Sequence, residues 1–150
     1  MCIHREGEDN AMTNELQNLA ELARSIWSDD AVSSDDFGFA LETGGDTLTF
    51  FSPSESPETL YCRAKVAPLV AETCPAGFAE DLLGGNFFWT GTRGGTLSFN
   101  EKDGIIYLTD RLDTGALDGE DALAGYVADF TRTLDDWRVR RAVYIKEEAL

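Results

Sequence analysis

The chain has few of the side chains that catalysis needs. Its only histidine among 150 residues is His4, which lies in the first few residues. A Ser-His-Asp triad, a Cys-His pair and a zinc set of His and Cys are therefore excluded. The stretches "GTRGG" and "GGNFFWTG" match neither GxxxxGK(S/T) nor GxGxxG, so their glycines indicate turns. These absences predict a protein that is not an enzyme and binds no cofactor or metal.

Cysteine is also scarce, and its spacing is not that of a disulfide or metal framework. Cys2, Cys62 and Cys74 form an odd set without a CxxC pair, which is typical of a reducing compartment. Cys62 falls on the apolar face of an expected strand and is interpreted as a buried structural thiol. No charged-then-apolar leader and no apolar run of about 20 residues is present. The prediction is a cytoplasmic protein.

Positive charge is the third shortage. The chain has 12 lysines and arginines against 28 acidic residues, a formal net charge of -16. Binding to nucleic acid or to an anionic membrane needs a positive surface, so neither is expected. Two interpretations of the acidity stay open: a preference for a basic partner, or protection against aggregation alone. Adjacent acidic pairs such as Asp135-Asp136 are interpreted as hydrated surface, because neighbouring side chains point apart.

A length of 150 residues suits one domain. Residues 1–12 lack apolar periodicity and are predicted to be a flexible leader, so that translation starts at either Met1 or Met12. Residues 13–145 are predicted to form the single domain, and residues 146–150 a tail.

The apolar periodicity predicts an α+β domain with an antiparallel sheet and the order α-β-β-β-α-β-β-α. The expected elements are a helix capped by Thr13, strands at 37–51 and 59–66, a short helix after Pro75 ending at Gly84-Gly85, strands at 96–112, and a long helix capped by Asp118.

The two expected hairpins have registers that follow from their sequences. A two-residue Gly44-Gly45 turn pairs Leu41 with Leu48 and Phe39 with Phe50, which places four apolar side chains on one face. In the second hairpin a two-residue Asp103-Gly104 turn would oppose Leu97 to Asp110. A four-residue loop at 101–104 instead pairs Leu97 with Leu108 and Phe99 with Ile106, and is preferred because one face stays apolar.

The element order and the stretch "LLGGNFFWTGTRGGTLSFNEKDGIIYL" resemble the class I type III secretion chaperones, the Tir chaperone (CesT-like) family. The resemblance covers about residues 16–137 and implies a bacterial cytoplasmic homodimer without enzymatic activity. It implies binding of the N-terminal region of a secreted effector, which is kept competent for export. The alternative is a regulatory or adaptor protein of the same fold, whose partner is not exported.

The resemblance also implies where a second copy would bind, because family members dimerise through the second helix and the fourth strand. Three successive aromatics there are many for one short connector to bury in a monomer, so either a second copy covers them or they fill the core beside Trp137. The positions predicted for the homodimer interface are Phe78, Leu82, Leu83, Phe87, Phe88, Trp89 and Leu97.

The effector is expected on the first helix and the first three strands. Phe51 points away from the apolar face of the first hairpin, and Tyr61 is its expected neighbour on the next strand. Arg63 would supply positive charge beside them, and Ile26 and Trp27 would form a wall of the same groove. The alternative is that the loop 52–57 covers Phe51.

Overall fold

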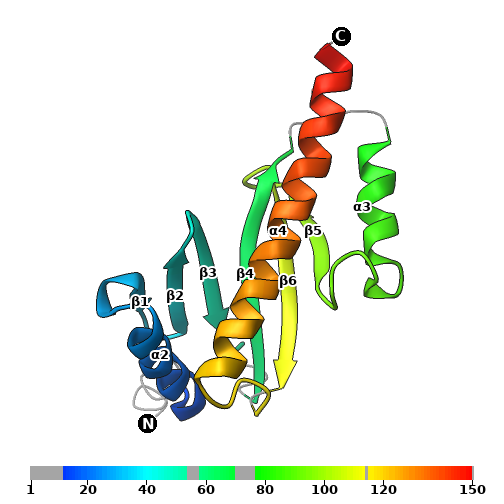
Figure 1. The fold of residues 1–150 in the computed structure, drawn as a ribbon. Coiled ribbons are helices and arrows are strands. Elements are labelled where there is room, and N and C mark those ends of the chain that lie inside the picture. The colour runs from blue at the N-terminus through cyan, green and yellow to red at the C-terminus, as the bar shows by residue number, and fades with distance from the viewer. Residues whose placement is uncertain (1–11, 54–57, 70–76, 114, 150) are drawn as a thin grey trace. The chain divides into compact units, whose positions relative to one another are not determined.

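The computed structural model describes residues 12–53, 58–69, 77–113 and 115–149 (Figure 1). The chain forms two compact units: unit 1 contains residues 1–63 and 111–126, and unit 2 contains residues 64–110 and 127–150. Strands β4 (Thr59–Pro68) and β6 (Ile105–Asp113) and helix α4 (Glu120–Ala149) pass through both. The strand order of the sheet is β1-β2-β3-β4-β6-β5. The predicted α+β class with an antiparallel sheet is confirmed.

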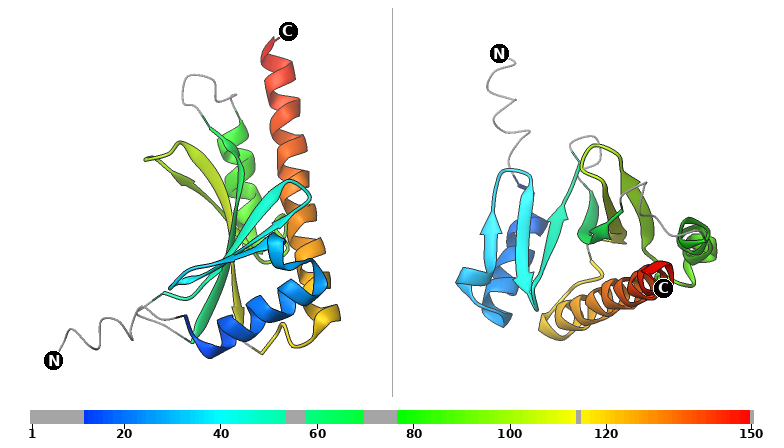
Figure 2. Two further views of the ribbon diagram at one scale, coloured as in Figure 1. Left: turned by 90° about the vertical axis from the view of Figure 1, so that its left-hand side faces the viewer. Right: turned by 90° about the horizontal axis from the view of Figure 1, so that it is seen from above.

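In the described part of unit 1 the first helix is α2 (Asn14–Ile26), an amphipathic helix whose start was predicted correctly. The Thr13 hydroxyl accepts a hydrogen bond from the Leu16 backbone N–H at 3.3 Å, as an N-cap should. Leu16, Leu19, Ala20 and Ala23 are buried along one stripe. This stripe faces β1 (Val32–Ser34) and β2 (Gly38–Thr43), so α2 covers one face of these strands (Figure 2).

The first hairpin has the predicted register. β2 pairs with β3 (Asp46–Phe51) so that Phe39 opposes Phe50 and Leu41 opposes Leu48, and all four side chains are buried. The Phe39 and Phe50 rings stack with centroids 4.9 Å apart. Gly44 and Gly45 have φ of 58° and 84°, which is why this tight turn needs glycine.

The short strand β1 was not predicted, and it lies between the first helix and the first hairpin of the expected order. The side chains of Ser33 and Ser34 show no apolar alternation that would have predicted a strand. Pairing with β2 makes this segment a strand, with Val32 opposite Leu41 and Ser34 opposite Phe39. The 3₁₀ helix η1 (Asp29–Ala31) connects α2 to it.

Unit 2 corrects the predicted end of the short helix. Helix α3 (Phe78–Asn86) continues through Gly84 and Gly85, and the 3₁₀ helix η3 (Phe87–Trp89) follows it directly. Gly85 permits a close approach and does not stop the helix, since a Cβ there would lie 2.3 Å from Cζ2 of Trp137. The predicted helix start at Pro75 lies outside the described residues.

The second hairpin has the four-residue loop that the apolar pattern favoured. Strand β5 (Thr96–Asn100) pairs with β6, so that Leu97 opposes Leu108 and Phe99 opposes Ile106. The predicted long helix is α4, which buries an apolar stripe that includes Trp137 in unit 2. Its first turn is preceded by Gly119 (φ 99°), one residue beyond the predicted cap Asp118. The helix extends to Ala149 and so includes most of the predicted tail.

Candidate functional site

The described residues offer surfaces for protein partners and hold no cluster suited to a metal. No group of three or more His, Cys, Asp or Glu side chains among them has the geometry to hold an ion. Cys62 is a buried thiol, as predicted, whereas Cys2 and Cys74 lie outside the described residues. Within the described chain, no helix is long and apolar enough to cross a membrane. The candidate sites are therefore places where apolar side chains reach the surface.

The first candidate is the β3–β4 cluster, which consists of Phe51, Tyr61 and Arg63. Phe51 pairs with Tyr61 across the two strands, and their rings stack with centroids 5.5 Å apart. The Arg63 guanidinium carbon lies 5.6 Å from the Phe51 ring centroid, a cation–π distance. Both aromatic rings remain partly exposed. The cluster is thus a half-open apolar platform with a positive charge at its edge.

Ile26 and Trp27 do not form a wall of this cluster. Ile26 is the last residue of α2, and Trp27 is its C-cap. Helix α2 packs on the face of the hairpin that buries Phe39 and Phe50. Phe51 is offset by one residue and so points to the other face. Trp27 makes no ring contact with Phe51 or Tyr61 in the described part of the chain. Ile26 and Trp27 therefore do not lie beside Phe51 and Tyr61, as the predicted groove would need.

The second candidate is the α3–η3 surface, which consists of Leu83, Phe87, Phe88 and Trp89. Their exposed fractions are 72%, 67%, 74% and 52%. The alternative that the three aromatics fill the monomer core beside Trp137 is therefore wrong. Phe87 and Phe88 meet edge to face with centroids 4.7 Å apart. Four large apolar side chains in a stretch of seven residues make an uncovered patch of the kind that interfaces use.

The backbone that presents this surface is strained. Phe88 and Trp89 have φ of 49° and 58°, a left-handed conformation that costs non-glycine residues about 1 kcal/mol or more each. Hydrogen bonds hold it: the Trp89 indole N–H donates to Thr96 Oγ1 at 3.2 Å, and the Gly91 N–H donates to the Gly85 carbonyl at 3.2 Å. The Trp137 indole N–H donates to the Gly91 carbonyl at 3.0 Å. The loop thus holds the aromatic rings outward at a cost.

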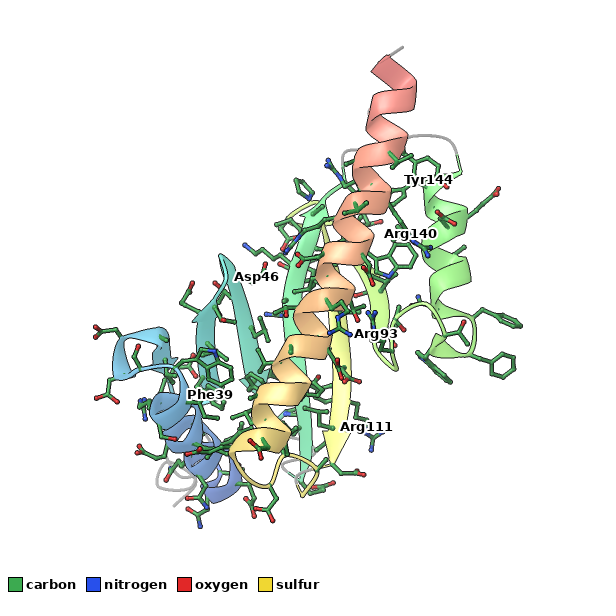
Figure 3. The ribbon with its side chains drawn as sticks, viewed as in Figure 1. Phe39, Asp46, Arg93, Arg111, Arg140 and Tyr144 are labelled. Atoms are coloured by element: carbon green, nitrogen blue, oxygen red, sulfur yellow. The ribbon has the colours of Figure 1, made fainter. Side chains whose placement is uncertain are left out.

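Arg93, the single arginine among these glycines, anchors the loop to α4. Its Nη1 donates to Thr133 Oγ1 at 2.8 Å and to Asp136 Oδ2 at 3.1 Å (Figure 3). Thr133 is buried, so this bond also satisfies a polar group inside unit 2. The arginine therefore has a structural role.

Three other residues of the predicted homodimer interface differ from the α3–η3 surface. Phe78 is fully buried at 0% exposure and packs on Tyr144, with ring centroids 5.2 Å apart. Leu97 is 6% exposed, and its backbone exchanges hydrogen bonds with the Asn86 side chain. These two side chains belong to the core of unit 2. Leu82 is half-buried at the margin of the surface.

Four exposed apolar side chains were missed in the sequence. Phe99 is 46% exposed on β5, although it opposes the buried Ile106. Phe37 is 58% exposed just before β2. In this turn, Asp35 Oδ1 accepts hydrogen bonds from the backbone N–H groups of Phe37 and Gly38. Val139 and Val143 are exposed on α4, and their i,i+4 spacing was a signal that could have found them. With Asp81, Arg140 and Tyr144 they line an open cleft of about 310 Å³ in unit 2. Figure 3 labels Arg140 and Tyr144.

Formal charge is distributed unequally between the units. Of the 28 acidic and 12 basic residues, 17 and 4 fall in unit 1, whereas 11 and 8 fall in unit 2. Unit 1 thus carries thirteen of the sixteen net negative charges.

In unit 2, the Tyr107 hydroxyl donates to Asp103 at 2.5 Å and lowers the pKa of that carboxyl.

The model of the Tir chaperone protein (CesT) family matches residues 17–138, most of the chain. The chain belongs to the Tir chaperone (CesT) family. The match includes the β3–β4 cluster and the α3–η3 surface, and it ends before Val139 and Val143 on α4. No curated protein matches the chain.

Solved structures share the fold at low sequence identity. A chain of the ExsC–ExsE complex superposes with a TM-score of 0.66 at 19% identity, covering 87% of this chain and 95% of that one. A chain of the HopA1–SchA chaperone–effector complex gives 0.61 at 20% identity, with coverage of 80% and 89%. The structure of the Yersinia pestis type III secretion chaperone SycH with a YscM2 fragment gives 0.59 at 13%, with coverage of 83% and 99%. These likenesses establish the secretion-chaperone fold for this CesT-family chain.

Proposed function

We propose that this protein is a cytoplasmic type III secretion chaperone, which acts as a homodimer and binds the N-terminal region of a secreted effector. The observation that carries the proposal is the family match over residues 17–138. Structures of the same fold include a chaperone–effector complex and a secretion chaperone bound to a protein fragment. The task of the chain is then to hold a segment of its partner extended until export.

The β3–β4 cluster is the proposed place where the effector binds. Its stacked Phe51 and Tyr61 rings lie on the face of the hairpin that α2 does not cover. An extended segment adds backbone hydrogen bonds at a sheet, and its alternate side chains need apolar surface to contact. Arg63 at the edge would pair with an acidic or carbonyl group of that segment. Ile26 and Trp27 are left out because α2 packs on the opposite face.

The α3–η3 surface is the proposed homodimer interface. Four exposed apolar side chains, two of them on a strained backbone, are costly to leave in water. A second copy would cover them, with Leu82 at the margin, and stable dimers commonly bury more than about 2,000 Å² in such contacts. Unit 2 suits self-association because its formal charge is close to balanced, so two copies repel each other weakly.

The protein is proposed to have no enzymatic activity. The sequence has one histidine and no phosphate loop, and the family is a chaperone family. Elemental analysis that detected stoichiometric zinc or iron in the purified protein would contradict this part of the proposal.

Affinity capture with mass spectrometry tests the central claim. The tagged full-length chain should retain one predominant protein, and deletion of the N-terminal region of that protein should abolish capture. The captured protein should fail to be exported from cells that lack this chain. If the tagged chain captures one predominant protein that is never exported, the chain is an adaptor of the same fold.

Phe51→Asp tests the binding face. The variant should weaken partner binding by about 2 kcal/mol, which is typical of an aromatic hot spot. Phe51→Leu keeps apolar area and serves as the matched control, so it should weaken binding less. Calorimetric titration with the captured partner provides the measurement. Because Phe51 is partly exposed, the dimer mass and the melting temperature should change little; unfolding of the variant, or unchanged affinity, would place the site elsewhere.

A further inference from the structure

A separate pocket of about 220 Å³ lies in unit 1, on the side of the sheet that α2 covers. It is bounded by α2 as far as Leu22, by Ser52 and Leu60 beside the β3–β4 connection, and by the segment that leads into α4. None of the proposed effector-binding residues lines it. For comparison, an engineered cavity of about 150 Å³ holds a benzene molecule, so one large side chain fits here.

The lining combines an apolar floor with an acidic rim. Five leucines form the floor, and four of them are buried, so they are already packed and shape a rigid base: Leu16, Leu19, Leu22, Leu60 and Leu117. Glu15 and Asp118 stand at the rim, and both are exposed. Among the described residues that line the pocket, none is basic. An apolar side chain would therefore enter between two carboxylates.

The N-termini of two helices lie near the pocket, and their partial positive charge opposes the negative charge of the rim. Helix α2 begins at Asn14 and α4 at Glu120, and each start carries the equivalent of about half a positive charge. Thr13 already caps the first of them. Glu15 and Asp118 contribute a full negative charge each, and unit 1 as a whole contributes a formal net charge of thirteen negatives. The rim is therefore negative on balance.

We propose that this pocket binds one apolar side chain of a basic segment: a leucine, isoleucine or methionine flanked by lysine or arginine in the protein partner. The leucine floor supplies burial, worth about 1.5–3 kcal/mol for a fully buried aliphatic side chain. The rim and the surrounding acidic surface supply charge complementarity, which speeds encounter and rejects acidic segments. An acidic segment of equal apolarity would face like charges on every side.

The proposal rests on the proposed function in one respect, because it names the chemistry of a segment of the chaperone's partner. The pocket and the β3–β4 cluster lie on opposite faces of the strands, so one partner chain would need to contact both. The proposal also distinguishes the two interpretations of the acidity, which are a preference for a basic partner and protection against aggregation alone. A surface that only prevents aggregation would not discriminate between basic and acidic peptides.

Two fluorescein-labelled peptides test it directly on the full-length chain: GSKRSLLSRKSG and GSEDSLLSDESG. Fluorescence anisotropy at low salt should give the basic peptide a dissociation constant at least about tenfold lower than that of the acidic peptide. Added salt should weaken the basic peptide's binding, because its charge contacts are exposed. Equal binding of the two peptides, or no binding of the basic one up to about 1 mM, would overturn the proposal.

Variants at exposed positions locate the binding. Asn18 lines the pocket, so Asn18→Trp should fill it and weaken binding about tenfold. Gln17→Trp, one residue away and outside the lining, should change binding less than about twofold. Wild-type affinity in Asn18→Trp would show that the peptide binds elsewhere and would overturn the proposal.

A second matched pair removes charge. Glu15→Gln with Asp118→Asn takes two carboxylates from the rim and should weaken binding about fivefold. Asp30→Asn with Asp36→Asn removes the same charge elsewhere in unit 1 and should change binding less than about twofold. Equal effects of the two pairs would mean that total charge, and not this rim, attracts the peptide.

The outcome can be separated from that of the proposed function. If the basic peptide does not bind and Asn18→Trp still captures an exported partner, the pocket proposal fails and the chaperone stands. If the pocket selects the basic peptide but no exported protein is ever captured, the pocket stands and the chaperone function fails.

Discussion

Unit 1 and unit 2 use their surfaces differently. Unit 1 is strongly acidic and keeps Phe51 and Tyr61 partly covered by their own stacking. Unit 2 is close to charge balance and leaves Leu83, Phe87 and Phe88 more than half exposed. Charge complementarity selects a foreign partner, whereas two copies of one acidic surface would repel each other. The comparison therefore supports the proposal that unit 1 recognises other proteins and that unit 2 self-associates.

Backbone strain is distributed in the same way. The non-glycine residues with left-handed φ in the described chain are Phe88, Trp89 and Arg93, and all three lie in unit 2. The hairpin of unit 1 uses Gly44 and Gly45 at its left-handed positions and avoids that cost. Strain of this kind persists only where surrounding contacts over-determine it, and it is often found at functional sites. The strained, exposed aromatic residues of unit 2 are thus the feature that a binding partner would explain best.

The largest expected effect tests whether the two units are thermodynamically separate. Phe50→Ala empties the core of unit 1, and Trp137→Ala empties that of unit 2; each should cost about 3–5 kcal/mol. Because β4, β6 and α4 run uninterrupted through both units, we expect one urea transition, shifted by either variant. Circular dichroism measures it. Two transitions, of which each variant moves only one, would mean that the units unfold independently.

The next effect tests the assignment of self-association to unit 2. Leu83→Asp would place an unpaired charge in the proposed interface and should weaken the dimer by about 3 kcal/mol or more. Phe37→Asp makes the same change at a 58% exposed position of unit 1 and should leave the mass unchanged. Light scattering at micromolar concentration decides between them. A monomeric mass for the unmodified protein would remove the homodimer from the proposed function.

A smaller effect distinguishes two neighbouring glycines of unit 2. Gly85→Ala should destabilise by about 1–3 kcal/mol, because its Cβ would overlap the buried Trp137 ring. At Gly84 a Cβ would meet nothing within 4 Å, so Gly84→Ala should stabilise the helix by about 0.5–1 kcal/mol. Thermal melts of the two variants should shift in opposite directions. Equal shifts would contradict the close packing of α3 on α4.

The smallest effect concerns charge in unit 2, where a carboxylate is stabilised locally. The Tyr107 hydroxyl is the main cause of the lowered pKa of Asp103, and the Ile105 N–H adds to it. A lowered folded-state pKa stabilises the fold above the unfolded-state pKa, and this contribution is lost as the pH falls through the folded-state value. Tyr107→Phe should raise the pKa of Asp103 toward its ordinary value, as carboxyl NMR titration can measure. An unchanged pKa would assign the shift to the backbone donors.

Local patterns were sufficient for much of the fold. The Gly44-Gly45 turn and the alternation around it defined the pairing of Leu41 with Leu48, because a slip by one residue would expose the whole apolar set. The same argument defined the four-residue loop before Ile105. Phe51 was expected on the opposite face for the same reason, and it stacks there on Tyr61.

Local patterns failed where a contact distant in sequence decides the structure. Strand β1 is a strand only because β2 lies beside it. Gly85 looked like a helix stop, yet it is the point where Trp137, more than fifty residues later, meets α3. Phe78 and Leu97 look as apolar as Phe87 and Phe88, and composition alone does not distinguish core residues from exposed ones.

By itself, the sequence determined most of the elements, the hairpin registers, the family and the acidic charge, since each follows from spacing or composition over short stretches. Only the tertiary structure decided which apolar side chains are left over after the core is filled. That depends on the packing of α2, α3 and α4 on the strands, because burial is a property of neighbours and not of the residue. The pocket under α2 arises in the same way, from leucines of three separate segments: Leu16, Leu60 and Leu117.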